Sequence, residues 1–111
     1  REAITEVHTG EITISTRSVE IEGVQVEKGQ VIALHDGKLV SSAPTIEEAL
    51  DELFQKANLE EIERITFFYG EGITQQQVNK LGDHVREGYP DKEIEIHEGG
   101  QPHYQLIIAF E

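Results

Sequence analysis

Apolar and polar residues alternate over much of the first 43 positions of the chain, as they do in half-buried β-strands. Glu11–Ser15 and Val19–Glu22 both repeat apolar residues with a period of two. Asp36-Gly37 favours a two-residue hairpin turn, because both central residues of such a turn adopt positive φ. This region therefore predicts short antiparallel strands joined by hairpins, with Arg1–Thr9 as either a tail or an additional strand.

The second part of the chain contains two stretches in which apolar residues recur with the helical period. Thr45 and Thr74 precede these stretches, and each is followed three residues later by Glu48 or Gln77, as in a capping box. We therefore expect two amphipathic helices, each with one face packed on a sheet. These faces consist of Ile46, Ala49, Leu50, Leu53, Phe54 and Ala57 in the first helix and Val78, Leu81 and Val85 in the second.

Three further segments have the composition of strands. Arg64–Tyr69 is rich in aromatic and β-branched residues and is expected to be central, Glu93–Ile96 alternates, and His103–Phe110 is apolar enough to lie inside the sheet. The order of strands, helix, strand, helix, strand and strand predicts an α/β fold. We expect a two-layer sandwich with a mixed, mostly antiparallel sheet, two helices on one face and β-hairpins in the N-terminal half.

The length of 111 residues suits one domain. We expect a single domain over residues 1–111, in which a strand and hairpin region (1–43) precedes an α-β-α-β-β region (44–111). The chain begins at Arg1 without a methionine, so we interpret it as a fragment of a larger protein. No apolar run approaches the roughly 20 residues that a membrane helix needs, and we expect a cytoplasmic location without membrane insertion.

The charge of the chain limits the classes of partner. Asp and Glu number 22 against 9 Lys and Arg, which gives a net charge of −13. Such a chain is a poor match for nucleic acid or an anionic membrane surface, because both are bound through Lys and Arg. A basic protein partner suits this charge better, and a well-solvated acidic surface without a partner is the simpler alternative.

Two segments raise the question of cofactor or metal chemistry. Gly70-Glu71-Gly72 lies where a strand passes into a helix, but it lacks the further residues of a nucleotide-binding motif, so we interpret it as a tight turn. His97 and His103, with Glu98, resemble part of a metal site that needs a third ligand such as His8, His35 or His84. We assign no metal, because this set needs a third ligand. We assign no catalytic residue, because no nucleophile motif is present.

The segment from His97 to Tyr104 has the most unusual composition in the chain. Gly99 and Gly100 permit close approach of another chain, and Pro102 stiffens the exit of the loop. His103 and Tyr104 add aromatic contacts. A conformationally fixed loop with aromatic side chains favours binding over chemistry, and the alternative is a plain hairpin connection without a partner.

Several motifs together resemble the C-terminal part of bacterial fatty acid kinase large subunits, the FakA or YloV-like proteins that carry DhaL and DAK-phosphatase-like regions. The resemblance extends over nearly the whole chain, and the element order is also similar to the C-terminal subdomain of DegV-type fatty-acid-binding proteins. The motifs are Thr9-Gly10-Glu11-Ile12-Thr13, Ile21-Glu22-Gly23-Val24, Lys28-Gly29, Asp36-Gly37-Lys38-Leu39-Val40, Tyr69-Gly70-Glu71, Tyr89-Pro90-Asp91 and Gly99-Gly100-Gln101-Pro102-His103-Tyr104.

This resemblance implies a non-catalytic C-terminal module of a kinase that acts in phospholipid metabolism. ATP and magnesium would belong to a kinase domain outside this chain, and this fragment would hold no cofactor. Its partners would be other domains of the parent chain and a fatty-acid-binding, DegV-like protein. We expect the partner-binding residues to be Glu71, Gly99, Gly100, Gln101, Pro102, His103 and Tyr104.

Two other hypotheses follow from the same residues. The first is a DegV-like domain that itself binds a small ligand, an acyl chain or an acyl phosphate, in a cavity between sheet and helices. The second is a metal-dependent hydrolase centred on His97 and His103.

Overall fold

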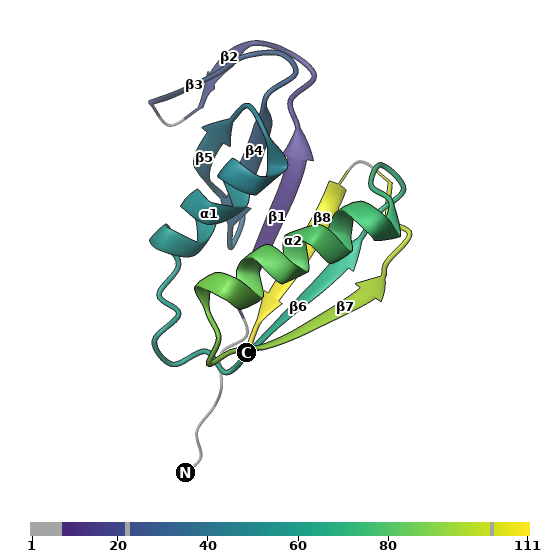
Figure 1. The fold of residues 1–111 in the computed structure, drawn as a ribbon. Helices are drawn as coiled ribbons and strands as arrows, with labels where there is room; N and C mark the ends of the chain where they lie inside the picture. Colours follow the sequence, from purple (N-terminus) through teal and green to yellow (C-terminus); the bar gives the residue numbers. More distant parts are fainter. Residues whose placement is uncertain (1–7, 22, 103) are drawn as a thin grey trace.

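The helices and the main sheet form two layers, and both helices lie on one face of the sheet (Figure 1). The computed structural model describes residues 8–21, 23–102 and 104–111. Within these residues the fold is α/β, with a mixed, mostly antiparallel sheet of six strands and hairpins in the N-terminal half. The predicted fold class is therefore confirmed.

Eight strands and two helices are described. Of the predicted N-terminal tail or strand, residues 1–7 lie outside the described part, and His8 and Thr9 belong to the first strand. The elements are β1 (His8–Ile14), β2 (Val19–Ile21), β3 (Val24–Val26), β4 (Val31–His35), β5 (Lys38–Ala43), α1 (Ile46–Lys56), β6 (Arg64–Tyr69), α2 (Gln75–Gly88), β7 (Glu93–Glu98) and β8 (Tyr104–Phe110).

The main sheet has the strand order β5-β4-β1-β8-β6-β7. The pair β6 and β7 is parallel, because α2 carries the chain back to the starting edge between them, and the other described pairs of this sheet are antiparallel. As predicted, β8 lies inside the sheet, between β1 and β6. Strand β6 also has a neighbour on each side, although it lies next to the edge strand and not at the centre.

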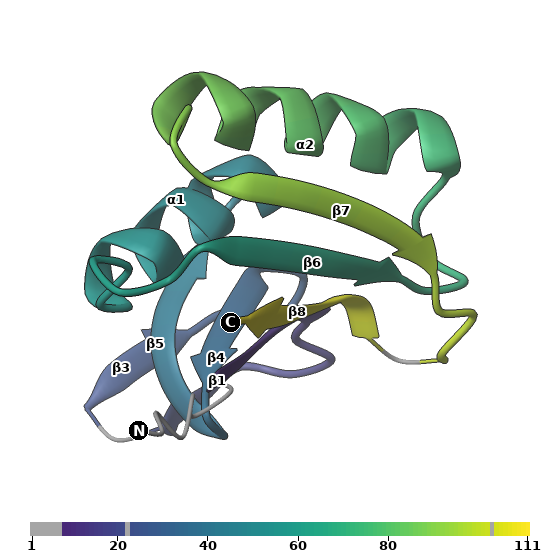
Figure 2. The same ribbon diagram turned by 90° about the horizontal axis from the view of Figure 1, so that it is seen from below.

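The sheet order corrects one expectation about the segment from His97 to Tyr104. It is not a hairpin connection, because β6 lies between β7 and β8. The chain leaves the end of β7, crosses over the carboxyl end of β6 and enters β8 on the other side (Figure 2). The loop therefore lies over the carboxyl end of β6, at one end of the sheet.

Strands β2 and β3 form a second sheet of two strands and do not join the main sheet. This hairpin folds over the end of the sheet that carries β4 and β5 (Figure 1). Val26 is completely buried there, and Gln30 joins the hairpin to β5 through a hydrogen bond that its side chain accepts from Ser42 at 2.8 Å. The alternating pattern predicted these strands correctly, but it does not specify which strands pair.

Both helices begin at the predicted caps. The Thr74 hydroxyl accepts from the Gln77 amide, and the Gln77 side chain accepts from the Thr74 amide, which is the complete capping box. At α1 only half of the box is described: the Thr45 hydroxyl accepts from the Glu48 amide at 3.2 Å.

The hydrophobic core lies between the two helices and the sheet. Helix α1 packs on β5, β4 and β1, and α2 packs on β7. The predicted apolar faces are buried as expected, since Leu50 and Leu53 of α1 and Val78 of α2 have no exposed surface. Phe67 of β6 and Phe110 of β8 fill the space between the layers. This packing determines where the loops of the sheet emerge.

Candidate functional site

The loop between β7 and β8 is tied to the carboxyl end of β6 by backbone hydrogen bonds. The amides of Gly99 and Gly100 donate to the Tyr69 carbonyl at 2.9 and 3.1 Å. The Glu71 amide donates to the Gln101 carbonyl at 3.1 Å. The structure thus brings Glu71 together with the glycine loop, although some thirty residues separate them in the sequence.

Gln101 is the internal brace of this loop. Its side-chain amide donates to the carbonyls of Phe68 at 2.9 Å and Tyr104 at 3.3 Å. Gly70 is required beneath the loop, because a Cβ there would collide with the backbone oxygens of Gln101 and Tyr104. These contacts tie the segment from Gly99 to Gln101 to β6, with positive φ at Gly100 (68°).

The remaining predicted residues differ in exposure. Glu71, Gly99, Gly100 and Pro102 are exposed, whereas Tyr104 is half-buried at the start of β8. His103 lies outside the described residues. The exposed part of the predicted binding surface thus consists of a short loop segment and the carboxylate of Glu71.

The Gly70-Glu71-Gly72 turn has the geometry of a strand-to-helix connection. The Gly70 amide donates to the Gln105 carbonyl at 3.0 Å, and the Glu71 amide is engaged by Gln101. A phosphate-binding loop needs such amides to point at the ligand. These two amides are already used within the fold, which agrees with the interpretation of this motif as a turn.

His97 lies on the face of the sheet that the helices do not cover. Its ring stacks on Phe68, with ring centroids 5.7 Å apart, and its Nε2 lies 3.2 Å from the Glu95 carboxylate. Within the described part of the chain, His97 belongs to no group of three residues with metal-ligand geometry. The histidines suggested as its third ligand lie in two other clusters.

The first of these clusters, here called the strand cluster, consists of His8, His35 and Asp36. His8 Nδ1 lies 2.8 Å from Asp36 Oδ2, and His35 Nε2 lies 3.9 Å from the same oxygen. The other carboxylate oxygen of Asp36 accepts from the Thr9 amide at 2.9 Å. This backbone hydrogen bond and the His8 contact lower the pKa of Asp36.

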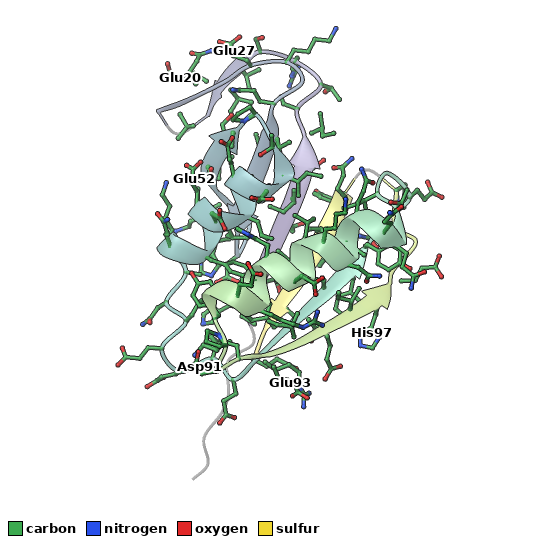
Figure 3. The ribbon with its side chains drawn as sticks, viewed as in Figure 1. Glu20, Glu27, Glu52, Asp91, Glu93 and His97 are labelled. Atoms are coloured by element: carbon green, nitrogen blue, oxygen red, sulfur yellow. The ribbon has the colours of Figure 1, made fainter. Side chains whose placement is uncertain are left out.

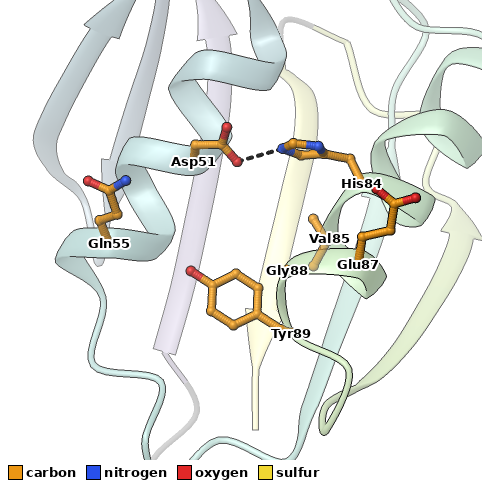
Figure 4. A pocket seen from close by; sticks show the side chains of 7 residues that line it. All are labelled: Asp51, Gln55, His84, Val85, Glu87, Gly88 and Tyr89. Atoms are coloured by element: carbon orange, nitrogen blue, oxygen red, sulfur yellow. Dashed lines mark hydrogen bonds and ion pairs between the residues drawn. The ribbon is translucent and has the colours of Figure 1, made fainter.

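The second cluster, here called the helix cluster, consists of Glu47 and Asp51 on α1 and His84 on α2 (Figure 4 shows Asp51 and His84). His84 Nε2 lies 2.8 Å from Asp51 Oδ1, and His84 Nδ1 lies 3.8 Å from Glu47 Oε1. The hydrogen bond with Asp51 raises the pKa of His84 against the opposing effect of burial, and the charges of Asp51, Glu47 and Glu87 add to the increase.

An open groove of about 420 Å³ runs between the two helices beside the helix cluster. Its lining combines polar and apolar surface, with Asp51, Gln55 and Glu87 around the Tyr89 ring (Figure 4). Burial raises the pKa of the Tyr89 hydroxyl, and the charge of Asp51 adds to this effect. An anionic ligand would meet two carboxylates in this groove.

Acidic side chains of the described residues lie on several elements, from the β2–β3 hairpin to β7 (Figure 3 labels Glu20, Glu27, Glu52, Asp91 and Glu93). Arg64 is one of the few cations, and it lies within 4 Å of Glu93, Glu95 and Glu111. These contacts raise the pKa of Arg64, chiefly through the hydrogen bond to Glu93. The exposed surface therefore presents mainly carboxylates to a partner.

Sequence reasoning did not identify either His–carboxylate cluster as a unit. His8 and His35 are 27 residues apart, and only the pairing of β1 with β4 brings them together. The one available signal was Asp36-Gly37, which places a carboxylate at a hairpin turn directly after a histidine. His84 and Asp51 meet because the two helices lie side by side.

Comparison with known proteins identifies relatives over the full length of the chain. The family of FakA-like C-terminal domains, which are the C-terminal parts of proteins similar to a fatty acid kinase component, matches residues 1–111. A Staphylococcus aureus protein that is described only as uncharacterized is 32% identical over 110 residues, which cover 99% of this chain and 20% of the relative. An uncharacterized Staphylococcus epidermidis protein is 34% identical with the same coverage. The chain thus spans about a fifth of these relatives.

Among the described residues, neither helix combines the length and the apolar character that a membrane crossing requires.

Proposed function

Because the chain belongs to the family of FakA-like C-terminal domains of fatty acid kinases, we propose that it is the module by which such a kinase docks its acyl-carrying partner. The partner is a DegV-like fatty-acid-binding protein. Docking brings the carboxylate of the bound fatty acid to an ATP and magnesium site in another domain of the parent protein. The contribution of this module is proximity, which by itself lowers the barrier of a reaction between two bound groups.

The single observation that carries the proposal is the fixed conformation of the loop over β6. Gln101 braces the loop from inside, and the amides of Gly99 and Gly100 attach it to Tyr69. A surface that is already ordered loses little conformational entropy when a partner binds. A loop that is tied down in this way supports the proposal of a recognition surface better than a mobile connection would.

Charge supports the choice of a protein partner. Glu71 and Glu98 are both exposed beside the loop, and the whole chain carries a net charge of −13. An acidic rim attracts a basic patch on the partner and speeds its association. We therefore place the docking surface at Glu71, Glu98 and the exposed backbone from Gly99 to Pro102.

A domain that itself binds an acyl phosphate is less well supported. The larger described groove is open and lined by Asp51 and Glu87, which would repel a carboxylate or a phosphate. The interior between sheet and helices is filled by Leu50, Phe67 and Phe110.

The docking surface is tested by reversing its charge. The double variant Glu71→Arg with Glu98→Arg alters the loop rim, and Glu60→Arg with Glu61→Arg makes the same change of net charge at the opposite end of β6. All four side chains are exposed, so both variants are expected to fold. Calorimetry with a purified DegV-like protein loaded with fatty acid is expected to give at least about tenfold weaker binding for the loop variant.

The control variant is expected to bind with an affinity within about threefold of that of the wild type. Charges far from the docking surface affect only the rate at which the partner approaches. Equal weakening in both variants would mean that the partner responds to net charge and not to this surface. Unchanged affinity in the loop variant would move the docking surface elsewhere.

A further inference from the structure

The strand cluster lies on the helix-facing side of the sheet, at the end where β1 begins and β4 ends. Gly10 pairs with His35, so His8, two residues earlier on β1, is the diagonal neighbour of His35 on the same face. Gly10 has no side chain to separate them, and the two imidazole rings lie 5.7 Å apart. Asp36 follows in the turn between β4 and β5 and turns its carboxylate toward both rings.

The three ligand atoms lie close enough together to bind one metal ion after small adjustments. His8 Nδ1 and His35 Nε2 lie 2.8 and 3.9 Å from Asp36 Oδ2, and all three atoms lie within 4.8 Å of one another. Zinc with nitrogen and oxygen ligands at its usual bond lengths places neighbouring ligand atoms about 3.4 Å apart. The observed distances bracket this value, so small side-chain rotations complete the geometry.

Two of the three ligands are held by the surrounding fold. The Asp36 oxygen that faces away from the histidines accepts from the Thr9 amide, and the Asp36 amide donates to the Thr9 carbonyl at 2.7 Å. The His35 ring packs edge-on against the buried Phe110 ring, at 6.1 Å between centroids. Such supporting contacts orient the ligands of known metal sites and increase their affinity.

A small cavity adjoins the two histidines and offers room for a fourth ligand. It has a volume of about 100 Å³ and is lined by both histidines together with Asn58, Leu59, Ile62 and Phe110, among others. A water molecule needs roughly 30 Å³, so the cavity accommodates one or more waters. A site with three protein ligands and a water in the remaining position is common for zinc.

From these observations we propose that His8, His35 and Asp36 bind one divalent transition-metal ion of the zinc class, with a water from the adjoining cavity as the fourth ligand. Two imidazoles and one carboxylate suit zinc better than magnesium or calcium, which prefer oxygen ligands. The ion joins the start of β1 to the β4–β5 turn. This site is separate from the docking loop and goes beyond the proposed function.

The helix cluster is the matched comparison for this proposal. It offers a single imidazole and two carboxylates, and the side chain of Glu47 is 60% exposed. Its two imidazole nitrogens face different carboxylates. It is therefore an ion-pair arrangement, and His84→Gln serves as the control for a nonspecific effect of removing a histidine.

The test is a titration of the untagged 111-residue chain with zinc chloride after treatment with EDTA, followed by calorimetry and metal analysis of gel-filtered protein. We expect one zinc per chain. His35→Gln is expected to weaken zinc binding by about 100-fold or more, because even the loss of a supporting contact costs 10- to 100-fold. His84→Gln is expected to bind zinc within about threefold of the wild type.

Two additions make the result decisive. His8→Gln changes a ligand whose side chain is 40% exposed, so it reports on the site even if His35→Gln fails to fold. Cobalt bound in the same site is expected to show the strong visible absorption of four-coordinate cobalt, and magnesium is expected not to compete. The proposal is overturned if the wild type retains no zinc, if magnesium displaces it, or if His84→Gln loses zinc as much as His8→Gln does.

Discussion

The strand cluster and the helix cluster contain the same kinds of side chain but differ in what holds them. In the strand cluster, Asp36 is anchored by a backbone amide and His35 rests on a buried ring. In the helix cluster, Asp51 and His84 hold each other through one hydrogen bond of 2.8 Å at the rim of an open groove. The first cluster is therefore anchored to a backbone amide and to the core, whereas the described contacts of the second join its own side chains to one another.

The difference follows from the elements that carry the residues. Neighbouring strands hold side chains on one face at a fixed spacing, and a turn adds a third group beside them. The apolar faces of helices α1 and α2 pack on the sheet, so the polar residues where the two helices lie side by side remain partly in solvent. The same residue types therefore suit metal binding at the sheet and a pH-dependent contact between the helices.

The largest expected effect comes from removing the ring beneath the strand cluster. Phe110 is 1% exposed and contacts both His35 and Phe54, with centroids 6.1 and 5.5 Å apart. Phe110→Ala is expected to lower the free energy of unfolding by about 3–5 kcal/mol, measured by urea denaturation. It is also expected to weaken zinc binding, because His35 loses its support.

Tyr89, which lines the groove beside the helix cluster, supplies the comparison for this variant. Tyr89→Ala removes a half-buried ring beside the groove and is expected to cost about 1–2 kcal/mol. If Phe110→Ala lowers the free energy of unfolding by no more than Tyr89→Ala does, Phe110 does not support the strand cluster in the way described.

Replacing the carboxylates of Asp36 and Asp51 is expected to have a smaller effect on the free energy of unfolding. The measurement is made in EDTA so that no metal contributes. Asp36→Ala leaves the Thr9 amide without its side-chain acceptor and places alanine at a φ of 51°, which together cost about 1–2 kcal/mol. Asp51→Ala removes one solvent-exposed contact and is expected to cost about 1 kcal/mol or less, part of which the better helix propensity of alanine offsets.

Asp36→Asn is the matched control, because asparagine tolerates positive φ and its side-chain oxygen still accepts from Thr9. Its cost is expected to be well below that of Asp36→Ala. Equal costs for Asp36→Ala and Asp51→Ala would remove the distinction between a backbone-anchored and an unanchored carboxylate.

The smallest expected effect is the pH dependence of the stability that the helix cluster contributes. Asp51, Glu47 and Glu87 raise the pKa of His84 above its ordinary value of 6.5. A group whose pKa is raised in the folded state stabilises the fold fully below its unfolded pKa and ceases to do so as the pH rises through its folded pKa. The wild type is therefore expected to exceed His84→Gln in melting temperature most at about pH 6.

This difference is expected to shrink as the pH increases above the folded pKa of His84, and melting curves of the two proteins at several pH values measure it. A wild-type advantage that grows with pH would have the wrong sign for a protonated His84. Asp51→Asn is expected to reduce the pH dependence, because it removes the main partner of the imidazolium.

The fold was largely predictable from local patterns. The helix faces, the Thr45 and Thr74 caps and the strand positions all follow from the period of apolar residues and from turn residues such as Asp36-Gly37. The prediction was incomplete for pairing, since β2 and β3 form their own sheet and the connection from β7 to β8 is not a hairpin. Periodicity identifies which face of a strand is buried but not its neighbours.

The candidate sites divide in the same way. The sequence by itself determined that the glycine loop is unusual and that the surface is acidic, because composition and backbone preference are local properties. Only the tertiary structure decided that this loop is braced on β6 by Gln101 and that His8 meets His35 and Asp36. Both depend on strand order and register, which result from packing between residues far apart in the chain.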